Sequence, residues 1–245
     1  MFRSIANTFA NCFKIPELKS RILFTLGLLG VCRLIAWIRI PGLDGTALTS
    51  YFNSHSQGSA GGLLGMYNTF AGGAYEHCAI GSLGIMPYIS ATIIIQLLTA
   101  VIPRLSKLSR EEGGRTKIIQ YGRYLTVLLC IGQGAFFAMG WENPQKAFPG
   151  FVGQLILSPD HIWWYRINTV LMMTVGTMIL MWLGEQITER GIGNGISLVI
   201  TIGIVARLPY AMTGLLDMFL SGAGIQSQYN VGHAVALILL LVGVV

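Results

Sequence analysis

Few residues in this sequence have both the type and the spacing that catalysis or metal binding requires. The four histidines are far apart, with no cysteine, aspartate or glutamate at metal-ligand spacing on a shared helix face. His77 and Cys78 are adjacent, which directs their side chains to different faces, so we interpret them as interfacial. The four cysteines form no CxxC pair and lie mostly in or beside apolar segments, which is typical of inert filling residues. The histidines are His55, His77, His161 and His233, and the cysteines are Cys12, Cys32, Cys78 and Cys130.

Two further motifs have the composition of a functional site. GIGNG at residues 191–195 resembles a phosphate-binding loop, but no predicted strand precedes it and no Walker lysine follows it. We interpret it as a turn that lets the next helix start close to its neighbours. Glu185 and Glu189 lie one helical turn apart beside Arg190, which favours a solvated or ion-paired cluster over acid–base chemistry. The sequence therefore predicts a protein that is no enzyme and uses no cofactor or metal.

The composition indicates which elements must position these residues. Hydrophobic residues make up 53% of the 245 and charged residues 11%, which would leave a soluble globule with too little polar surface. The sequence therefore predicts an all-α polytopic membrane protein. Its net charge of +6 comes from basic residues clustered beside apolar stretches without an RNA-binding motif, so we expect no direct nucleic-acid contact. We interpret this charge first as a determinant of topology, and second as an attraction for anionic lipid or a docking partner.

Apolar stretches predict six membrane spans, at residues 22–40, 80–102, 124–141, 167–183, 196–212 and 231–245. The connecting segments are 41–79, 103–123, 142–166, 184–195 and 213–230. Residues 1–21 begin with Phe2, Ile5, Phe9 and Phe13 at spacings of three and four, which predicts an amphipathic surface helix, with a frayed tail as the alternative. The last apolar run reaches Val245 without a flanking charge, so we expect the sixth span to be truncated there.

Lysine and arginine residues determine the expected orientation of these spans. They are concentrated in the amino-terminal segment and in residues 103–123, whereas residues 41–77 contain none. By the positive-inside rule, the amino terminus and residues 103–123 face the cytoplasm, and residues 41–77 face outward. Residues 184–195 are then cytoplasmic, and residues 142–166 and 213–230 are external.

The stretch before the second span is the feature around which the chain is organised. Residues 62–74 are apolar but too short and too rich in glycine to cross a bilayer, so we interpret them as a half-helix that enters and turns back. Non-helical backbone survives at membrane depth only where protein or water satisfies its polar groups. A broken segment beside a spanning helix therefore predicts a cavity or a pore.

Four isoleucines repeat one spacing at two places. Ile85 and Ile89 are four residues apart and share a helix face, and Ile196 and Ile200 do the same at the start of the fifth span. Spacing alone leaves ordinary contacts with lipid or the protein core as the simpler explanation.

Three residues depart from the apolar pattern of the first two spans. Arg33 lies inside the first span, where a charge is costly unless the side chain snorkels or meets a partner. Because the outer end is about a turn and a half away, we expect Arg33 to snorkel. Pro87 predicts a kink or a local loosening of the second span, as is common in helices that line cavities. Gln96 is expected to face protein or water rather than lipid.

Three segments of the chain resemble a known family. GIMPYISATIIIQLL, REEGGRTKIIQYGRY and MWLGEQITERGIGNGISLVI are similar to sequences of the SecY family, the channel subunits of the bacterial general secretion translocase. The resemblance extends from about Ile15 to the end of the chain. It implies a SecY-type helical channel of ten spans in two pseudo-symmetric halves. This chain would hold the first five-helix half, with a re-entrant plug half-helix and the start of the sixth span.

The resemblance also implies roles by position. Residues 62–73 would be the plug that blocks the outer funnel of the resting channel, and the isoleucines would be this half's share of a hydrophobic pore ring. One face of the second span would form one side of a lateral gate. The basic residues between the second and third spans would contact a cytoplasmic partner, and the alternative is that they only determine topology. The positions are the pore ring Ile85, Ile89, Ile196 and Ile200; the plug Gly62, Leu63, Leu64, Gly65, Met66, Phe70, Gly72 and Gly73; the lateral gate Ser90, Ile93, Gln96 and Leu97; and the cytoplasmic contact Arg104, Lys107, Arg110, Arg115, Lys117 and Arg123.

The family implies a pore subunit that moves unfolded secretory chains across the plasma (inner) membrane of a bacterium and releases apolar segments sideways into lipid. The implied partners are SecE, SecG, the SecA motor ATPase, a translating ribosome and signal sequences. Two rival classes are a secondary transporter and a membrane scaffold or insertase without a continuous pore. A transporter would need ionisable residues in several spans, and beyond Arg33 the spans offer almost none.

Overall fold

The computed structural model describes residues 15–55, 62–111, 113–148, 151, 153–156, 162–209 and 212–213. The chain divides into two compact units, residues 1–203 and residues 204–245. The first unit contains the helices that position the candidate site. In the second unit, the chain turns at residues 206–207, where Arg207 N donates to the Ile204 carbonyl at 3.1 Å.

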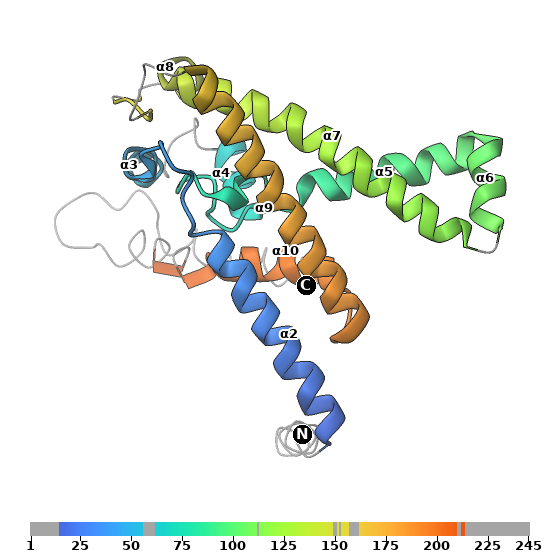
Figure 1. The fold of residues 1–245 in the computed structure, drawn as a ribbon. Helices are drawn as coiled ribbons and strands as arrows, with labels where there is room; N and C mark the ends of the chain where they lie inside the picture. Colours follow the sequence, from blue (N-terminus) through green and yellow to red (C-terminus); the bar gives the residue numbers. More distant parts are fainter. Residues whose placement is uncertain are drawn as a thin grey trace, which may run out of the picture. The chain divides into compact units, whose positions relative to one another are not determined.

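Helices dominate the described part of the chain (Figure 1). Two isolated β-bridges, Arg39–Ala79 and Leu43–Ile156, occur among the described residues, which contain no strand. The all-α prediction is therefore confirmed over this part of the chain. The helices are α2 (Pro16–Ile35), α3 (Gly45–His55), α4 (Gly62–Phe70), the 3₁₀-helix η2 (Ile80–Leu83), α5 (Met86–Val101), α6 (Pro103–Arg110), α7 (Gly114–Glu142), α8 (Pro144–Ala147), α9 (Ile162–Arg190) and α10 (Gly195–Val205).

Two of the described helices, α7 and α9, are long and apolar enough to cross a membrane. Each has 29 residues, about 44 Å at 1.5 Å per residue, which exceeds the roughly 30 Å of a bilayer core. A third candidate is α5 together with α6, which are bent by 101° at their junction. At the expected first and fifth spans, α2 contains four charged residues and α10 is only 11 residues long. The six-span topology therefore stays a prediction, and residues 1–14 and 231–245 lie outside the described residues.

The first helix differs from the predicted span 22–40 at both ends. It begins at Pro16, with Glu17 in its first turn, an arrangement that suits the positive end of a helix dipole. It ends at Ile35, and after a turn at residues 36–37 the chain pairs with residues 78–80. Ile40 N donates to the Cys78 carbonyl at 2.9 Å, and Ile80 N donates to the Ile38 carbonyl at 2.9 Å. Hydropathy does not separate an apolar helix from apolar extended backbone, which explains the difference at the carboxyl end.

The second helix begins later than its apolar run. Residues 80–83 form η2, Gly84 follows with a φ of +59°, and α5 starts at Met86. Pro87 therefore lies in the first turn of α5, where a missing backbone N–H costs nothing. The predicted kink at Pro87 is wrong, because the proline starts this helix rather than bending it.

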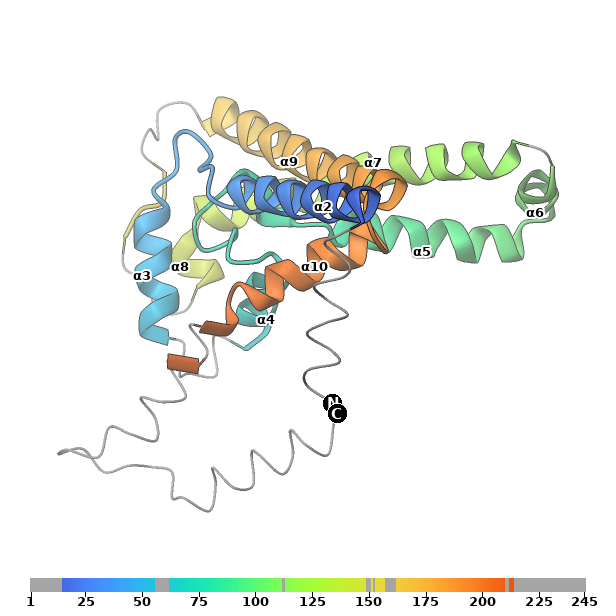
Figure 2. The same ribbon diagram turned by 90° about the horizontal axis from the view of Figure 1, so that it is seen from below.

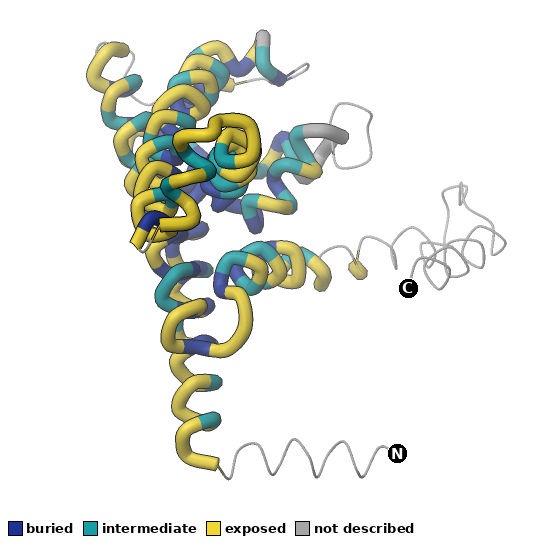
Figure 3. Tube along the Cα trace, turned by 90° about the vertical axis from the view of Figure 1, so that its right-hand side faces the viewer, coloured by how far each residue is buried: buried dark blue, intermediate teal, exposed yellow. Residues whose placement is uncertain are grey.

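The core of the first unit contains two large apolar clusters and a small cluster of alanines. The first, the aromatic cluster, surrounds Trp141, Phe148 and Tyr75 and receives side chains from α3, α4, α7 and α9. The second, the α10 cluster, lies among α2, α5, α9 and α10. Figure 3 shows these buried residues as short patches on a trace that is otherwise largely exposed. The exposed remainder is consistent with helices that meet lipid or other chains.

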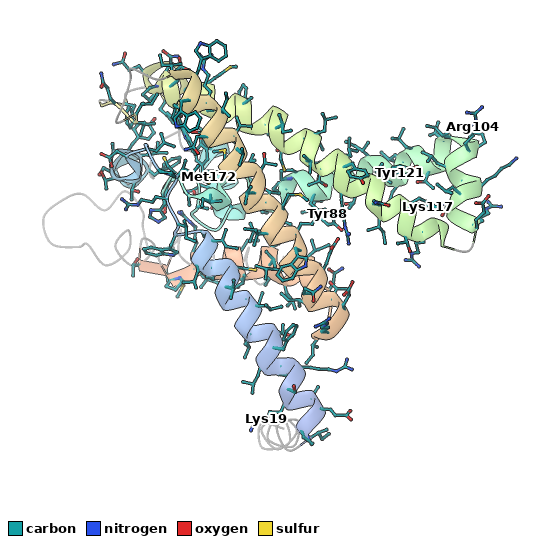
Figure 4. The ribbon with its side chains drawn as sticks, in the orientation of Figure 1. Lys19, Tyr88, Arg104, Lys117, Tyr121 and Met172 are labelled. Carbon is teal, nitrogen blue, oxygen red and sulfur yellow. The ribbon has the colours of Figure 1, made fainter. Side chains whose placement is uncertain are left out.

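Helices α5 and α7 run side by side, and α6 joins them at one end (Figures 1 and 2). We call the end formed by α6 and the first turns of α7 the arm tip, residues 103–123. Arg104 lies at this end, and Lys117 and Tyr121 follow along α7 (Figure 4). At the other end of α5, Tyr88 is buried in the α10 cluster.

Candidate functional site

The four predicted ring isoleucines lie in one cluster. Ile85, the residue that precedes α5, belongs to the buried α10 cluster and is only 4% exposed. Ile89 on α5 and both Ile196 and Ile200 on α10 are half-buried and pack against the same cluster. Two helices that are distant in the sequence are therefore brought together through these residues. Their function as a seal stays a prediction.

The turn before α10 has the structure that the GIGNG motif predicts. Asn194 accepts from the backbone N–H groups of Ile196 and Ser197 at 3.1 and 3.4 Å, so it acts as the N-cap of α10. Gly195 N donates to Thr188 Oγ1 on α9 at 2.9 Å, and Ile192 N donates to Thr25 Oγ1 on α2 at 3.2 Å. The prediction that this turn brings the fifth helix close to its neighbours is confirmed. The sequence contained a signal for this N-cap, because an asparagine stands directly before a glycine and an apolar run.

The predicted half-helix is present as α4, which turns back through a glycine cap. Gly72 N donates to the Thr69 carbonyl at 3.1 Å, and Gly73 N donates to the Asn68 carbonyl at 2.8 Å. These two bonds form a Schellman motif, which needs left-handed backbone. Gly72 and Gly73 provide it with φ values of +65° and +87°. The helix thus ends abruptly, and the chain reverses toward η2.

The side chains of α4 are unevenly buried. Leu64 and Tyr67 pack against the aromatic cluster, whereas Met66 is 64% exposed and Phe70 is 42% exposed. Gly65 is half-buried, and Gly62 and Leu63 form the first turn, of which only the backbone is described. The half-helix therefore presents an apolar surface that the described residues leave exposed.

A small cavity adjoins the carboxyl end of the half-helix. Its volume is about 30 Å³, enough for roughly one water molecule. Phe70 at the end of α4, Ile85 before α5 and Ile200 on α10 line it together with Arg33 on α2. Half of the predicted ring and the end of the predicted plug therefore border one space.

Arg33 does not have the conformation that the sequence predicted. Its Nη1 donates to the Gly72 carbonyl at 3.1 Å, within the protein. The prediction that Arg33 snorkels is wrong, because the charge meets a backbone acceptor instead. A single sequence offers no signal for such a partner, since Gly72 is 39 residues away.

A polar group that the sequence did not predict lies next to the half-helix. Asn68 is only 1% exposed, and its Nδ2 donates to Glu76 Oε2 at 2.8 Å, while Glu76 N donates to Asn68 Oδ1 at 3.2 Å. His77 Nε2 lies 3.6 Å from Glu76 Oε1, and the His77 ring stacks on Trp37 at 5.3 Å between centroids. Thr49 on α3 donates to the Glu76 carbonyl at 3.1 Å. These contacts fix the loop that follows the half-helix.

The predicted lateral-gate residues lie along α5. Ser90 is half-buried, whereas Ile93, Gln96 and Leu97 are exposed, Leu97 to 62%. These exposed side chains give α5 a mostly apolar face that the described part of the chain leaves open. The gate assignment stays a prediction.

The predicted cytoplasmic-contact residues gather at the arm tip, and one of them, Arg123, is ion-paired with another helix. Arg123 forms a bidentate ion pair with Glu185 on α9, with Nε–Oε1 at 3.1 Å and Nη2–Oε2 at 2.8 Å. Glu185 is therefore ion-paired, as one of the two predicted alternatives has it, and its partner comes from α7 rather than from the neighbouring Arg190. The other contact residues, Arg104, Lys107, Arg110, Arg115 and Lys117, are exposed.

A second ion pair joins the opposite end of the same two helices. Arg166 on α9 donates through Nε and Nη2 to the carboxylate of Glu142 on α7, both at 3.0 Å. Its guanidinium also lies 5.2 Å from the ring centre of Trp163. Within the described residues, no three His, Cys, Asp or Glu side chains gather in a metal-binding arrangement.

Long apolar helices, a half-helix that turns back and an apolar cluster beside it define a helical membrane protein. A family model described as SecY matches residues 79–245, more than half of the chain. The chain belongs to the SecY family.

Curated relatives agree with this assignment. The protein translocase subunit SecY of Buchnera aphidicola subsp. Acyrthosiphon kondoi is 47% identical over 207 residues, which are 84% of this chain and 55% of the relative. That of Escherichia coli (strain K12) is 46% identical over 84% of this chain and 44% of the relative. That of Vibrio cholerae (serotype O1, strain El Tor Inaba N16961) is 44% identical over 94% and 47%. The chain thus spans about half the length of these relatives.

Solved structures show the same fold. One is described as "The structure of a protein conducting channel", with a TM-score of 0.56 and 18% identity over 91% of this chain and 46% of that chain. A second is described as "Sec61 in the Canine ribosome-channel complex from the endoplasmic reticulum", with the same TM-score, identity and coverage. At this identity the likeness concerns the fold alone.

Proposed function

We propose that this chain is part of the central pore subunit of the general secretory protein-conducting channel. The channel moves unfolded polypeptides across the bacterial plasma membrane and releases apolar segments sideways into lipid. The observation that carries the proposal is the apolar cluster in which four isoleucines from two distant segments lie beside the carboxyl end of a half-helix. Membership of the SecY family supports it.

The isoleucines act as a collar rather than as a binding site. Dispersion contacts are weak and non-directional, so flexible aliphatic side chains close around a moving chain without holding any one sequence. Ile85, Ile89, Ile196 and Ile200 form this half's part of the collar. Ile85 is buried, whereas the half-buried Ile89, Ile196 and Ile200 have surface to offer a passing chain. When no chain is present, the collar is a dry constriction that opposes ion flow.

The half-helix acts as a plug, and the open face of α5 acts as one side of a lateral gate. The exposed side chains Met66 and Phe70 fill the pore on the outer side of the collar. At the gate, an apolar signal sequence leaves the channel between Ile93 or Leu97 and the second half of the protein. It gains roughly 25 cal/mol per Å² of apolar surface transferred from water into lipid.

Energy for transport comes from a partner at the cytoplasmic face, since the subunit is a conduit and not an enzyme. The partners are the SecA motor or a translating ribosome, with SecE and SecG as membrane subunits. We place the amino terminus and the arm tip in the cytoplasm, where the exposed basic side chains of Arg104, Lys107 and Lys117 attract anionic lipid or a partner. A structure of the same fold is described as Sec61 in a ribosome–channel complex, which is the reason for including the ribosome among the partners.

The test is ion leakage through the full-length protein in liposomes. Replacing Ile89 and Ile200 by serine, or deleting residues 62–73, is expected to raise leakage and to relax the rejection of defective signal sequences. Ile131→Ser is the matched control, because Ile131 is an exposed isoleucine on α7 outside the cluster. Unchanged leakage in both altered proteins would refute the seal and favour a scaffold without a continuous pore.

A further inference from the structure

The carboxyl end of the half-helix is bound by an arginine from a different helix. Arg33 on α2 donates from Nη1 to the Gly72 carbonyl at 3.1 Å. Gly72 is the left-handed residue of the cap that ends α4. Its carbonyl lies two residues beyond Phe70, the last residue of α4, and accepts a charge-assisted hydrogen bond from the guanidinium. The bond therefore joins α2 to the polar end of α4.

The space around this bond is tight for any residue larger than glycine. A Cβ on Gly72 would lie 2.5 Å from Arg33 Nη1 and 3.2 Å from Gly203 Cα on α10. The turn is thus held between the Arg33 side chain and the backbone of α10. A methyl group there would push the guanidinium or the α10 backbone aside. The fit makes the contact sensitive to small displacements of the half-helix.

The bond also lies beside the predicted pore ring. Arg33 lines the small cavity together with Phe70, Ile85 and Ile200, which are mostly apolar surroundings. A hydrogen bond with a charged donor is stronger in such surroundings than at a protein surface. The position of Arg33 therefore couples the location of the half-helix to the location of the ring.

We propose that Arg33 is a positioning residue that holds the half-helix next to the isoleucines, and that its bond to Gly72 must break before the half-helix can leave. The inference rests on the proposed function, in which the half-helix is a movable plug. The bond from Arg33 lowers the free energy of the arrangement in which Gly72 is in place, relative to every arrangement in which Gly72 has moved away. It thereby favours the closed channel until a substrate provides compensating contacts.

Hydrogen–deuterium exchange of residues 69–74 tests the inference in the full-length protein in lipid. Arg33→Gln is expected to speed exchange at these amides at least about tenfold, the lower bound for losing a charge-assisted bond. Arg33→Lys keeps the charge but loses the planar guanidinium, so we expect an intermediate rate. Arg21→Gln is the matched control, because Arg21 is an exposed arginine on the same helix, and its rate is expected to match that of the unaltered protein.

A second variant tests the contact itself. Gly72→Ala also speeds exchange, because it strains the cap and displaces Arg33. If the two residues act through one contact, the effect of Gly72→Ala is smaller in the Arg33→Gln background than in the unaltered protein. Fully additive effects would contradict the contact.

Ion leakage is measured on the same samples, so that the two proposals can fail separately. Unchanged exchange at residues 69–74 in Arg33→Gln overturns the role of Arg33, whatever the leakage. Faster exchange with unchanged leakage keeps Arg33 as a positioning residue and counts against the seal. Residues 126–138 of α7 serve as an internal reference for the fold. If residues 126–138 also exchange faster in Arg33→Gln, that variant has lost part of its fold, and the Arg33→Lys protein is used instead. An unchanged exchange rate at residues 69–74 of Arg33→Lys then overturns the inference.

Discussion

Gly176 on α9 is the position where a single added methyl group has the clearest expected effect on stability. A Cβ there would collide with the Ile80 carbonyl oxygen and would lie 2.5 Å from Ile80 Cγ2 and 2.7 Å from Ile80 C. Two of these three atoms are backbone, so no rotamer change relieves the contact. Gly176→Ala must therefore push η2 away from α9, and η2 leads directly to Ile85.

The magnitude follows from a comparison with a glycine in open surroundings. Gly132 on α7 is also inside a long apolar helix, and a Cβ there meets no atom within 4 Å. Both substitutions remove the cost of a helical glycine, up to about 1 kcal/mol, so this gain cancels in the comparison. Overpacking costs about 1–3 kcal/mol, and a backbone obstacle places Gly176 at the upper end. Gly176→Ala is therefore expected to be about 3 kcal/mol less stable than Gly132→Ala.

Thermal unfolding in detergent, followed with a thiol-reactive dye, measures this difference. Cys32, Cys78 and Cys130 are buried, so the dye reacts with them as the protein unfolds. Cys12 is replaced by serine in all samples to give a uniform background. A difference of about 3 kcal/mol corresponds to a midpoint lower by several degrees in Gly176→Ala. Equal midpoints for the two alanine variants would refute the close packing of α9 on η2.

The remaining predictions concern polar contacts outside the apolar clusters. Arg123→Ala and Glu185→Ala are each expected to lower the free energy of unfolding by no more than about 1 kcal/mol, because the pair is partly exposed, and a double-mutant cycle measures the coupling. Asp44 accepts from Thr46 N at 2.9 Å at the start of α3, so Asp44→Ala is expected to cost about 1 kcal/mol at pH 7. Hydrogen bonds from Thr46 lower the pKa of Asp44, so its contribution is complete above the ordinary carboxyl pKa and is lost as the pH falls through the lowered one. The melting midpoints of the two proteins should converge in acid, and a constant gap would contradict this role.

The apolar pattern of the sequence predicted where most helices lie but not where they end. The predicted spans 124–141 and 167–183 both lie inside longer helices, α7 and α9. Hydropathy marks the part of a helix that lipid would surround, whereas the helix itself continues into charged sequence. Arg123 and Glu185 therefore lie on helix extensions rather than in loops. The short helix α3 gave no apolar signal, although Asp44 before it was a cap signal.

Contacts between distant residues could not be predicted from a single sequence. The glycines of the half-helix and the isoleucine spacing were visible because they are local patterns. The bond from Arg33 to Gly72 spans 39 residues, and the pair Arg123–Glu185 spans 62. Each partner has an ordinary local environment, and only the packing of α2, α7 and α9 brings the partners together.

The attachment of α10 determines how an opening between the isoleucines would change shape. Thr25 and Thr188 fasten the start of α10 to α2 and α9, so Ile196 and Ile200 move with that bundle. Ile85 and Ile89 instead accompany α5, which leans on α7. Because each pair belongs to one segment of the chain, we expect the two pairs to move as two opposing rigid edges and not as a ring that opens evenly. In the proposed pore, the opening on this side would therefore widen into a slot, which suits a flat extended polypeptide better than a round one.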